Sequence, residues 1–245
     1  MNHIELKSID QKRMTEVGNL ARHIQHTLIS NVLTETLWSR HIDECLKYRF
    51  HAAMIPGAWV KKTKQALNGT GVRVASLIDF AYGTMTSAGK TREALNLVAD
   101  GAEEIDLMPN VGFLLSGMET EYLDDIRGVV DAAGSVPVKI MLELPLLNPK
   151  QRDRAIALSI EAGVRYLKNA SGGAVGTATP DDIRFLRQAA PPGVGVKASG
   201  GIKTARQVRD LLEAGADLVG TSSGAKIMLE LLSQQAAADG SQDSY

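Results

Sequence analysis

The chain has 245 residues, with 27 basic and 28 acidic side chains and a formal net charge of -1. Its length suits one mid-sized barrel or two small domains, and its 44% hydrophobic residues can fill a sizeable core. The basic excess of a nucleic-acid binder is missing, the single cysteine, Cys45, excludes an intrachain disulfide, and no apolar run could span a bilayer. We therefore expect a cytoplasmic protein that acts on a small soluble molecule.

Short apolar runs alternate with amphipathic stretches along most of the chain. We predict strands at residues 24–28, 51–55, 73–78, 104–108, 138–143, 166–169, 195–198 and 218–221. Helical patterns stand between strands at residues 90–99, 121–132, 150–161, 180–188 and 205–213. Eight strand–helix units in a chain of this length favour a closed α/β fold, a single (β/α)₈ TIM barrel. An open, doubly wound sheet is the alternative.

The junctions and ends of the chain complete this prediction. Gly101, Gly163 and Gly215 each stand between a helix and a strand, where a left-handed residue ends a helix. Residues 11–23 predict an N-terminal helix outside the repeat. The small, polar segment 236–245 predicts a flexible C-terminal tail, so the expected domain is one barrel over residues 1–235.

Three lysines occur in apolar strands: Lys139, Lys168 and Lys197. A single buried lysine is as readily explained by a salt bridge or by an ammonium group that reaches the surface. In a barrel, however, the C-terminal strand ends converge, so three successive strands would bring these amines together. Crowding and burial lower a lysine pKa from about 10.4 toward neutrality, and a neutral amine can attack a carbonyl to form a Schiff base.

Asp106, at the end of the apolar run 105–108, is the expected proton carrier. The alternative role for Asp106 is that of a counter-ion for the lysines. Glu143, which follows the strand of Lys139, is expected to be such a counter-ion. His23, His26, His41 and His51 lack metal-ligand spacing, so we predict neither a metal nor a cofactor.

Two glycine-rich turns follow the last two strands, at residues 199–204 and 220–224. Each precedes a helix, and backbone N–H groups at such a position bind phosphate in many barrels. Tight turning alone would also explain the glycines. We predict a phosphate site that contains Gly200, Gly201, Lys203, Gly220, Ser222 and Ser223, with Gly172 from the turn at 171–173.

These motifs together resemble the deoxyribose-phosphate aldolase family, from about residue 24 to residue 232. The resemblance rests on residues 25–28, 80–83, 104–106, 110–112, 138–140, 168–172, 197–204 and 220–224. It implies that Lys168 forms the Schiff base, that Lys197 perturbs it and relays protons, and that Asp106 transfers protons. It also implies reversible cleavage of 2-deoxyribose 5-phosphate to glyceraldehyde 3-phosphate and acetaldehyde without a metal, with Thr27 and Lys139 at the substrate. A terminal tyrosine, here Tyr245, reaches the active site in some members; a tail without a role is the alternative.

The chain departs from the family pattern at several positions that we expect near the substrate. Gln25 replaces a usual aspartate, and Met54 stands near a frequent cysteine. Further departures are Ala81, Leu115, Asn169 and Gly173. Because lost polar groups change which substrate hydroxyls can be bound, they leave the substrate open.

Four functions are therefore compatible with the sequence. The first is a lyase of the deoxyribose-phosphate aldolase type, acting on that sugar phosphate or a close relative. The second is a Schiff-base aldolase for another, non-phosphorylated hydroxyaldehyde. A phosphate-binding isomerase or synthase, and a catalytically silent barrel used for binding, complete the alternatives. The expected partners are a small sugar phosphate or aldehyde and further copies of the chain, as a homodimer or larger homo-oligomer, with no nucleic acid and no membrane.

Overall fold

The computed structural model describes residues 19–172 and 174–240. Eight parallel strands, hydrogen-bonded in chain order, close into one barrel in which β8 returns to β1. They are β1 (Ile24–Thr27), β2 (Ala52–Met54), β3 (Arg73–Ile78), β4 (Glu104–Leu107), β5 (Val138–Met141), β6 (Tyr166–Lys168), β7 (Gly195–Ser199) and β8 (Leu218–Thr221). The predicted (β/α)₈ barrel is confirmed, and the open sheet is excluded.

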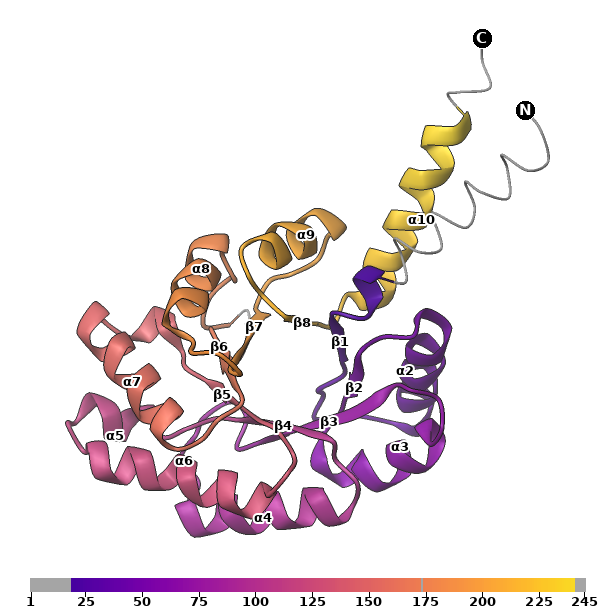
Figure 1. The fold of residues 1–245 in the computed structure, drawn as a ribbon. Helices are drawn as coiled ribbons and strands as arrows, with labels where there is room; N and C mark the ends of the chain where they lie inside the picture. The colour runs from indigo at the N-terminus through magenta and orange to yellow at the C-terminus, as the bar shows by residue number, and fades with distance from the viewer. Residues whose placement is uncertain (1–18, 173, 241–245) are drawn as a thin grey trace.

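Helices surround the ring of strands (Figure 1). They are α2 (Glu35–Tyr48), α3 (Val60–Leu67), α4 (Ser87–Ala99), α5 (Val111–Leu115), α6 (Glu119–Ala133), α7 (Pro149–Glu161), α8 (Pro180–Ala189), α9 (Ala205–Glu213) and α10 (Gly224–Gly240), with the 3-10 turns η1 (Gly57–Trp59) and η2 (Leu144–Leu146). The five helical patterns named from the sequence fall within α4, α6, α7, α8 and α9. Within the described ranges, no helix is long and apolar enough to cross a membrane.

The predicted ends of the chain are only partly covered by the structure. Residues 19–21 are helical, and the rest of the predicted N-terminal helix up to residue 18 lies outside the described residues. Helix α10 runs to Gly240, which is beyond the predicted barrel boundary at residue 235. Residues 241–245 of the predicted tail, including Tyr245, lie outside the described residues, so the flexibility of that tail stays a prediction.

Local signals in the sequence account for several element boundaries. Helix α9 begins with a capping box, in which the Thr204 side chain accepts from the Gln207 backbone N–H and the Gln207 side chain accepts from the backbone of Thr204. The three junction glycines, Gly101, Gly163 and Gly215, have φ values of 97°, 91° and 108°. Each therefore adopts the left-handed conformation predicted for it.

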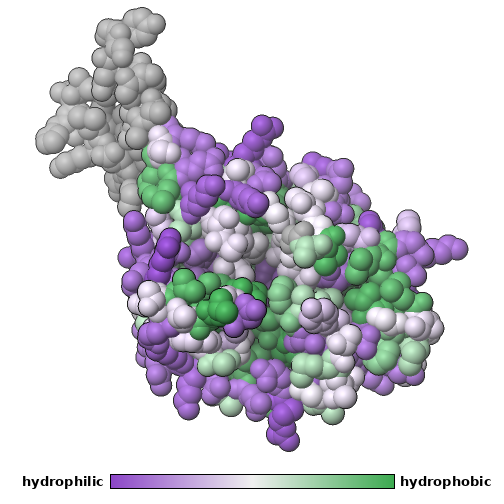
Figure 2. Space-filling view, turned by 180° about the vertical axis from the view of Figure 1, so that it is seen from behind, coloured by the Kyte–Doolittle hydropathy of each residue, from purple (hydrophilic) through white to green (hydrophobic). Residues whose placement is uncertain are grey.

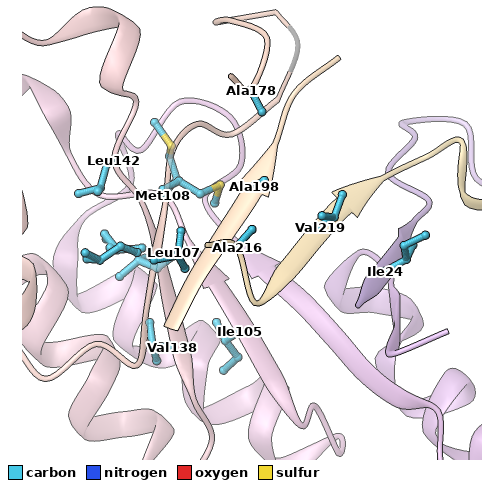
Figure 3. Packing of buried hydrophobic residues seen from close by; sticks show 14 of the residues in the cluster. Ile24, Ile105, Leu107, Met108, Val138, Leu142, Ala178, Ala198, Ala216 and Val219 are labelled. Carbon is cyan, nitrogen blue, oxygen red and sulfur yellow. The ribbon is translucent and has the colours of Figure 1, made fainter. Parts of the chain in front are cut away.

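The main hydrophobic core lies between the strands and the outer helices. Ile105 and Leu107 on β4, Val138 on β5 and Val219 on β8 are buried there (Figure 3). Because side chains alternate along a strand, the intervening residues point into the barrel. Those inner positions include charged residues on β4, β5, β6 and β7, whereas barrel interiors are usually filled by branched apolar side chains.

Candidate active site

Lys139, Lys168, Lys197 and Asp106 come together inside the barrel, all of them buried. The strand register brings them there, because Lys168 is the partner of Lys197 and Asp106 is the partner of Lys139. The predicted convergence of the three lysines on one carboxylate is therefore present in the structure.

A single oxygen of Asp106 joins two of the amines. Its Oδ2 accepts from Lys168 Nζ at 2.8 Å and from Lys197 Nζ at 2.6 Å. Its Oδ1 has no hydrogen-bond partner within residues 19–172 and 174–240, and Lys139 Nζ lies 3.6 Å from it. Asp106 is thus both a counter-ion and a group within proton-transfer reach of two amines.

Burial and neighbouring charges shift the protonation equilibria of this cluster. Burial lowers the pKa of Lys197, Asp106 opposes that shift, and Lys168 and Lys139 add to it, so that the pKa falls to about 7. Burial alone would raise the pKa of Asp106, but the ammonium groups of Lys168, Lys197 and Lys139 outweigh it and hold that pKa below its usual range. A carboxylate therefore faces an amine that can exist in both protonation states near neutral pH.

Lys139 lies deeper in the barrel than the sequence suggested. Its Nζ forms an ion pair with Glu104 Oε2 at 2.6 Å. It is fully buried and is not among the residues that line the cavity. The structure therefore does not place Lys139 in contact with a substrate. The physical reason is the strand register: Lys139 pairs with Tyr166, whereas Lys168 pairs with Met141, two residues further toward the C-terminal ends of the strands.

In the described part of the chain Glu143, the expected counter-ion of the lysines, forms an ion pair with none of them, although the charge of Lys168 acts on it. Strand β5 ends at Met141, and Glu143 has a left-handed φ of 52°. Its carboxylate accepts from the Ser171 backbone N–H instead. Burial raises the pKa of Glu143, against the hydrogen bonds from Ser171 and the charge of Lys168. The second carboxylate of the lysine cluster is Glu104.

A cavity of about 590 Å³ opens at the C-terminal ends of the strands, where barrel active sites lie. It is lined by these predicted site residues: Thr27, Asp106, Lys168, Gly172, Lys197, Gly200, Gly201, Lys203, Gly220, Ser222 and Ser223. Apolar side chains of β1, β2, β3 and β5 and their following loops line it as well, namely Ile29, Met54, Leu77, Phe80 and Met141. One side of the cavity is therefore suited to an anion and another to apolar groups.

The glycines at the polar side are there for steric reasons. Gly200 has φ 111°, and a Cβ on it would come within 2.3 Å of the Gly176 carbonyl oxygen. A Cβ on Gly220 would come within 2.6 Å of Ser199 Oγ and 3.1 Å of Lys197 Cε. Helices α9 and α10 begin beyond these turns, which directs helix N-termini toward this side of the cavity.

Some of the positions that depart from the family pattern line the cavity, and others do not. Met54 lines the cavity, whereas Leu115 is exposed at the end of α5 and does not. Asn169 bridges β6 and β7, donating to the Ser199 carbonyl oxygen at 3.0 Å and accepting from the Ser199 backbone N–H at 2.8 Å. Gly173 lies outside the described residues. Gln25 is fully buried and contacts Lys197.

Glu104 is a site residue that the sequence analysis did not single out. It accepts from Gln25 Nε2 and pairs with Lys139. The available signal was its spacing of two residues from Asp106, which places both carboxylates on one face of β4. Within the described ranges, no three His, Cys, Asp or Glu side chains cluster in a way that would hold a metal ion.

The chain is similar to known aldolases over most of its length. The family model for DeoC/LacD family aldolases matches residues 53–230. A deoxyribose-phosphate aldolase of Streptococcus equi subsp. zooepidemicus is 36% identical over 210 residues, covering 86% of this chain and 96% of that protein. A deoxyribose-phosphate aldolase of Brevibacillus brevis is 37% identical over 210 residues, covering 86% of this chain and 95% of that protein.

Solved structures have the same fold. A putative deoxyribose-phosphate aldolase from Coccidioides immitis superposes with a TM-score of 0.82 at 28% identity, covering 94% of this chain and 98% of that one. The tetrameric deoxyribose phosphate aldolase from Aeropyrum pernix gives a TM-score of 0.82 at 28% identity, covering 96% of this chain and 100% of that one. The protein is therefore a carbon–carbon lyase that belongs to the DeoC/LacD family of aldolases, among relatives named deoxyribose-phosphate aldolase.

Proposed function

We propose that the protein is a class I aldolase that reversibly cleaves 2-deoxyribose 5-phosphate to glyceraldehyde 3-phosphate and acetaldehyde. The observation that carries this proposal is the sharing of Asp106 Oδ2 by Lys168 and Lys197 at the floor of the cavity. It puts a nucleophilic amine, a second amine with a lowered pKa and a proton-carrying carboxylate within hydrogen-bond distance of one another. The names of the relatives support the same substrate.

Both Lys168 and Lys197 line the cavity, and Lys168 is assigned as the nucleophile because it stands at the position that the family resemblance gives to the Schiff-base lysine. Its neutral amine adds to the aldehyde carbon C1 of the open-chain sugar, and the resulting carbinolamine loses water to give a protonated imine. Asp106 and Lys197 are close enough to supply and remove the protons that this exchange requires.

Cleavage then breaks the bond between C2 and C3. A base removes the proton of the C3 hydroxyl, the C3–O bond becomes the carbonyl of glyceraldehyde 3-phosphate, and the electron pair of the broken bond moves to the imine nitrogen to give an enamine. Protonation of the enamine at C2 and hydrolysis by water release acetaldehyde and restore the Lys168 amine. Lys197 and Asp106 are the proposed proton carriers for the last steps.

The glycine turns are the proposed phosphate site. Gly172, Gly200, Gly201, Gly220, Ser222 and Ser223 line the same side of the cavity as Lys203. Close approach of backbone to ligand is possible where no Cβ intervenes, and Lys203 adds a positive charge that faces the cavity from an exposed position.

We further propose that the chain forms a homo-oligomer. The related deoxyribose phosphate aldolase from Aeropyrum pernix is described as tetrameric. The surface of this chain carries large exposed apolar side chains, including Val32 and Tyr82, and apolar patches are visible on the face shown in Figure 2. Light scattering coupled to size-exclusion chromatography tests this proposal, and a monomer at micromolar concentration would contradict it.

Reductive trapping tests the proposed chemistry. Borohydride added with 2-deoxyribose 5-phosphate or acetaldehyde should attach a substrate fragment to Lys168, located by peptide mass spectrometry. Lys168→Leu should abolish both trapping and turnover. Lys47→Leu is the matched control, because Lys47 lies exposed in the last turn of α2 and should trap like the parent. The aldolase proposal fails if no aldehyde is trapped and Lys168→Leu turns over like the parent.

A substrate comparison tests the phosphate site separately. The value of kcat/KM should be at least about 100-fold higher for 2-deoxyribose 5-phosphate than for 2-deoxyribose, since phosphate contacts supply binding energy that remains through the transition state. Lys203→Ala should reduce that preference mainly through KM. Equal kcat/KM values for the two sugars would instead favour an aldolase for non-phosphorylated hydroxyaldehydes.

A further inference from the structure

A group of buried polar side chains lies next to Lys197 inside the barrel. Gln25 on β1 accepts a hydrogen bond from Lys197 Nζ through Oε1 and donates one to Glu104 Oε2 through Nε2. Gln25 and Glu104 are both fully buried, and neither lines the cavity. A side chain from β1 therefore connects the amine on β7 with a carboxylate on β4.

Chemistry allows only one orientation of the Gln25 amide. An ionised carboxylate accepts hydrogen bonds, so the amide NH₂ must face Glu104. A lysine ammonium only donates, so the amide oxygen must face Lys197. Glu104 is ionised because Lys139 and His51 lower its pKa by more than burial raises it. Glu104 thus fixes the amide, and the amide fixes the position of the Lys197 amine.

Glu104 has its own set of cationic and polar partners. Its carboxylate lies 2.6 Å from Lys139 Nζ, 2.7 Å from His51 Nε2 and 2.9 Å from Arg73 Nη1. The neutral amide of Gln25 stands between this carboxylate and Lys197. Among the residues that the structure describes, Lys197 therefore contacts one carboxylate, Asp106, and shares that group with Lys168.

We propose that Gln25 is a positioning residue for this reaction: held by Glu104, its amide directs the Lys197 amine onto Asp106 and keeps the Glu104 carboxylate out of contact with that amine. The inference rests on the proposed Schiff-base function. It adds a role for a residue that touches neither substrate nor the reacting atoms.

The charges around Lys197 agree with this arrangement. The charges that act on Lys197 come from Asp106 on β4, Lys139 on β5 and Lys168 on β6, whereas its contact on β1 is the neutral amide of Gln25. With a single shared carboxylate, the pKa of the buried Lys197 stands at about 7, which leaves an unprotonated fraction at neutral pH. A second carboxylate in direct contact would favour the ammonium form.

Two variants test the two parts of the proposal. Gln25→Met keeps the approximate volume and removes both hydrogen bonds. It should lower kcat by about 10-fold or more because the Lys197 amine loses its alignment, while KM stays within about twofold because the phosphate site lies on other strands. The double variant Gln25→Glu/Glu104→Gln exchanges the amide and the carboxylate, so the number of charges and of hydrogen-bonding groups is unchanged.

The exchange variant gives the sharper result. Its negative charge touches Lys197, so the acidic limb of the kcat–pH profile should move up by about one pH unit or more. A purely structural role for Gln25 would not move this limb. Thr63→Val is the control, because Thr63 is also fully buried and accepts from Trp38 Nε1 in the outer layer, away from the cavity. It should keep the parental kcat and pH profile.

The proposal is overturned if the exchange variant has the parental pH profile, or if folded Gln25→Met retains the parental kcat. Near-ultraviolet circular dichroism establishes folding, and if Gln25→Met does not fold, the exchange variant decides alone. Borohydride trapping on Lys168 in the parent separates this outcome from the proposed function. A parent that cannot be trapped, together with a Lys168→Leu variant that turns over like the parent, refutes the aldolase proposal. A trapped parent with unaffected Gln25 variants refutes only the role of Gln25.

Discussion

Gly220→Ala should disable Lys197 with little loss of stability. An added Cβ would lie 2.6 Å from Ser199 Oγ, about 0.8 Å inside the 3.4 Å at which ordinary contacts begin, and 3.1 Å from Lys197 Cε. Ser199 Oγ can rotate away cheaply, because it is the end of a short side chain. Lys197 has less freedom, since its Nζ is held by Gln25 and by Asp106 at 2.6 Å.

The expected magnitudes follow from these contacts. Overpacking a buried site costs about 1–3 kcal/mol, and the flexible neighbours place this change near the lower end. Displacing a reacting group by about 1 Å can cost about 100-fold in rate, or about 2.7 kcal/mol of transition-state stabilisation. The loss of kcat should therefore exceed what the loss of stability would produce.

Gly128→Ala is the matched control for this prediction. Gly128 lies in α6 and does not line the cavity, and a Cβ on it would also approach the end of a short side chain, Thr91 Oγ1 at 2.8 Å. Steady-state kinetics on 2-deoxyribose 5-phosphate, together with thermal unfolding, should show Gly128→Ala close to the parent in kcat and Gly220→Ala about 100-fold lower in kcat, with its Tm lower by only a few degrees. Equal kcat values for the two variants would refute the assigned geometry around Lys197.

Four further predictions follow from the buried charges. Because the pKa of Lys197 falls to about 7 in the folded chain, kcat should rise with pH through about 7, and Lys197→Met should remove that limb from a kcat–pH profile. Lys197 also makes the free energy of unfolding increase as pH rises from about 7 toward the ordinary lysine pKa, because in that pH range the unfolded chain binds one more proton than the folded chain. Urea unfolding at pH 7 and pH 9 should show this increase for the parent and a smaller increase for Lys197→Met. Lys139→Met should leave KM within about twofold of the parent in steady-state assays, because Lys139 does not line the cavity. A tenfold rise in KM would instead show that Lys139 contacts the substrate. Lys90 Nζ lies 2.7 Å from Asp125 Oδ2, and both side chains are fully buried. Lys90→Met should therefore lower the free energy of unfolding by about 3–5 kcal/mol and Tm by about 10 °C in calorimetry, and an unchanged Tm would contradict the pairing.

Part of the barrel interior is filled by charged side chains of this site in place of apolar packing. Inner positions that would ordinarily hold branched apolar side chains carry Lys139, Lys168, Lys197, Glu104 and Asp106. Burying charges is costly unless each is paired. The two carboxylates on β4 pair with the lysines of β5, β6 and β7, and this pairing also shifts the pKa of Lys197 and Asp106 as proton transfer requires.

The fold was predictable from the sequence because its signals are local. Alternating strand and helix patterns, the capping box at Thr204 and Gln207, and the left-handed Gly163 depend on residues close in the chain. The convergence of Lys168 and Lys197 was also predictable. Strand alternation points both inward, and barrel closure brings the strand ends together.

Contacts between distant strands were decided only by the tertiary structure. The sequence could place Lys139 on the inner face, but its depth below Lys168 depends on the register of β5 against β6. Within the described residues Glu143 forms no ion pair with a lysine. Strand β5 ends at Met141, so the alternation of side chains along the strand no longer determines where Glu143 points. Lys197 and Gln25 are 172 residues apart, and no local pattern links them. The sequence by itself thus determined which residues are charged and which face of a strand they occupy. The partner of each charge was decided by the closed barrel, because barrel closure determines which inward-pointing side chains come into contact.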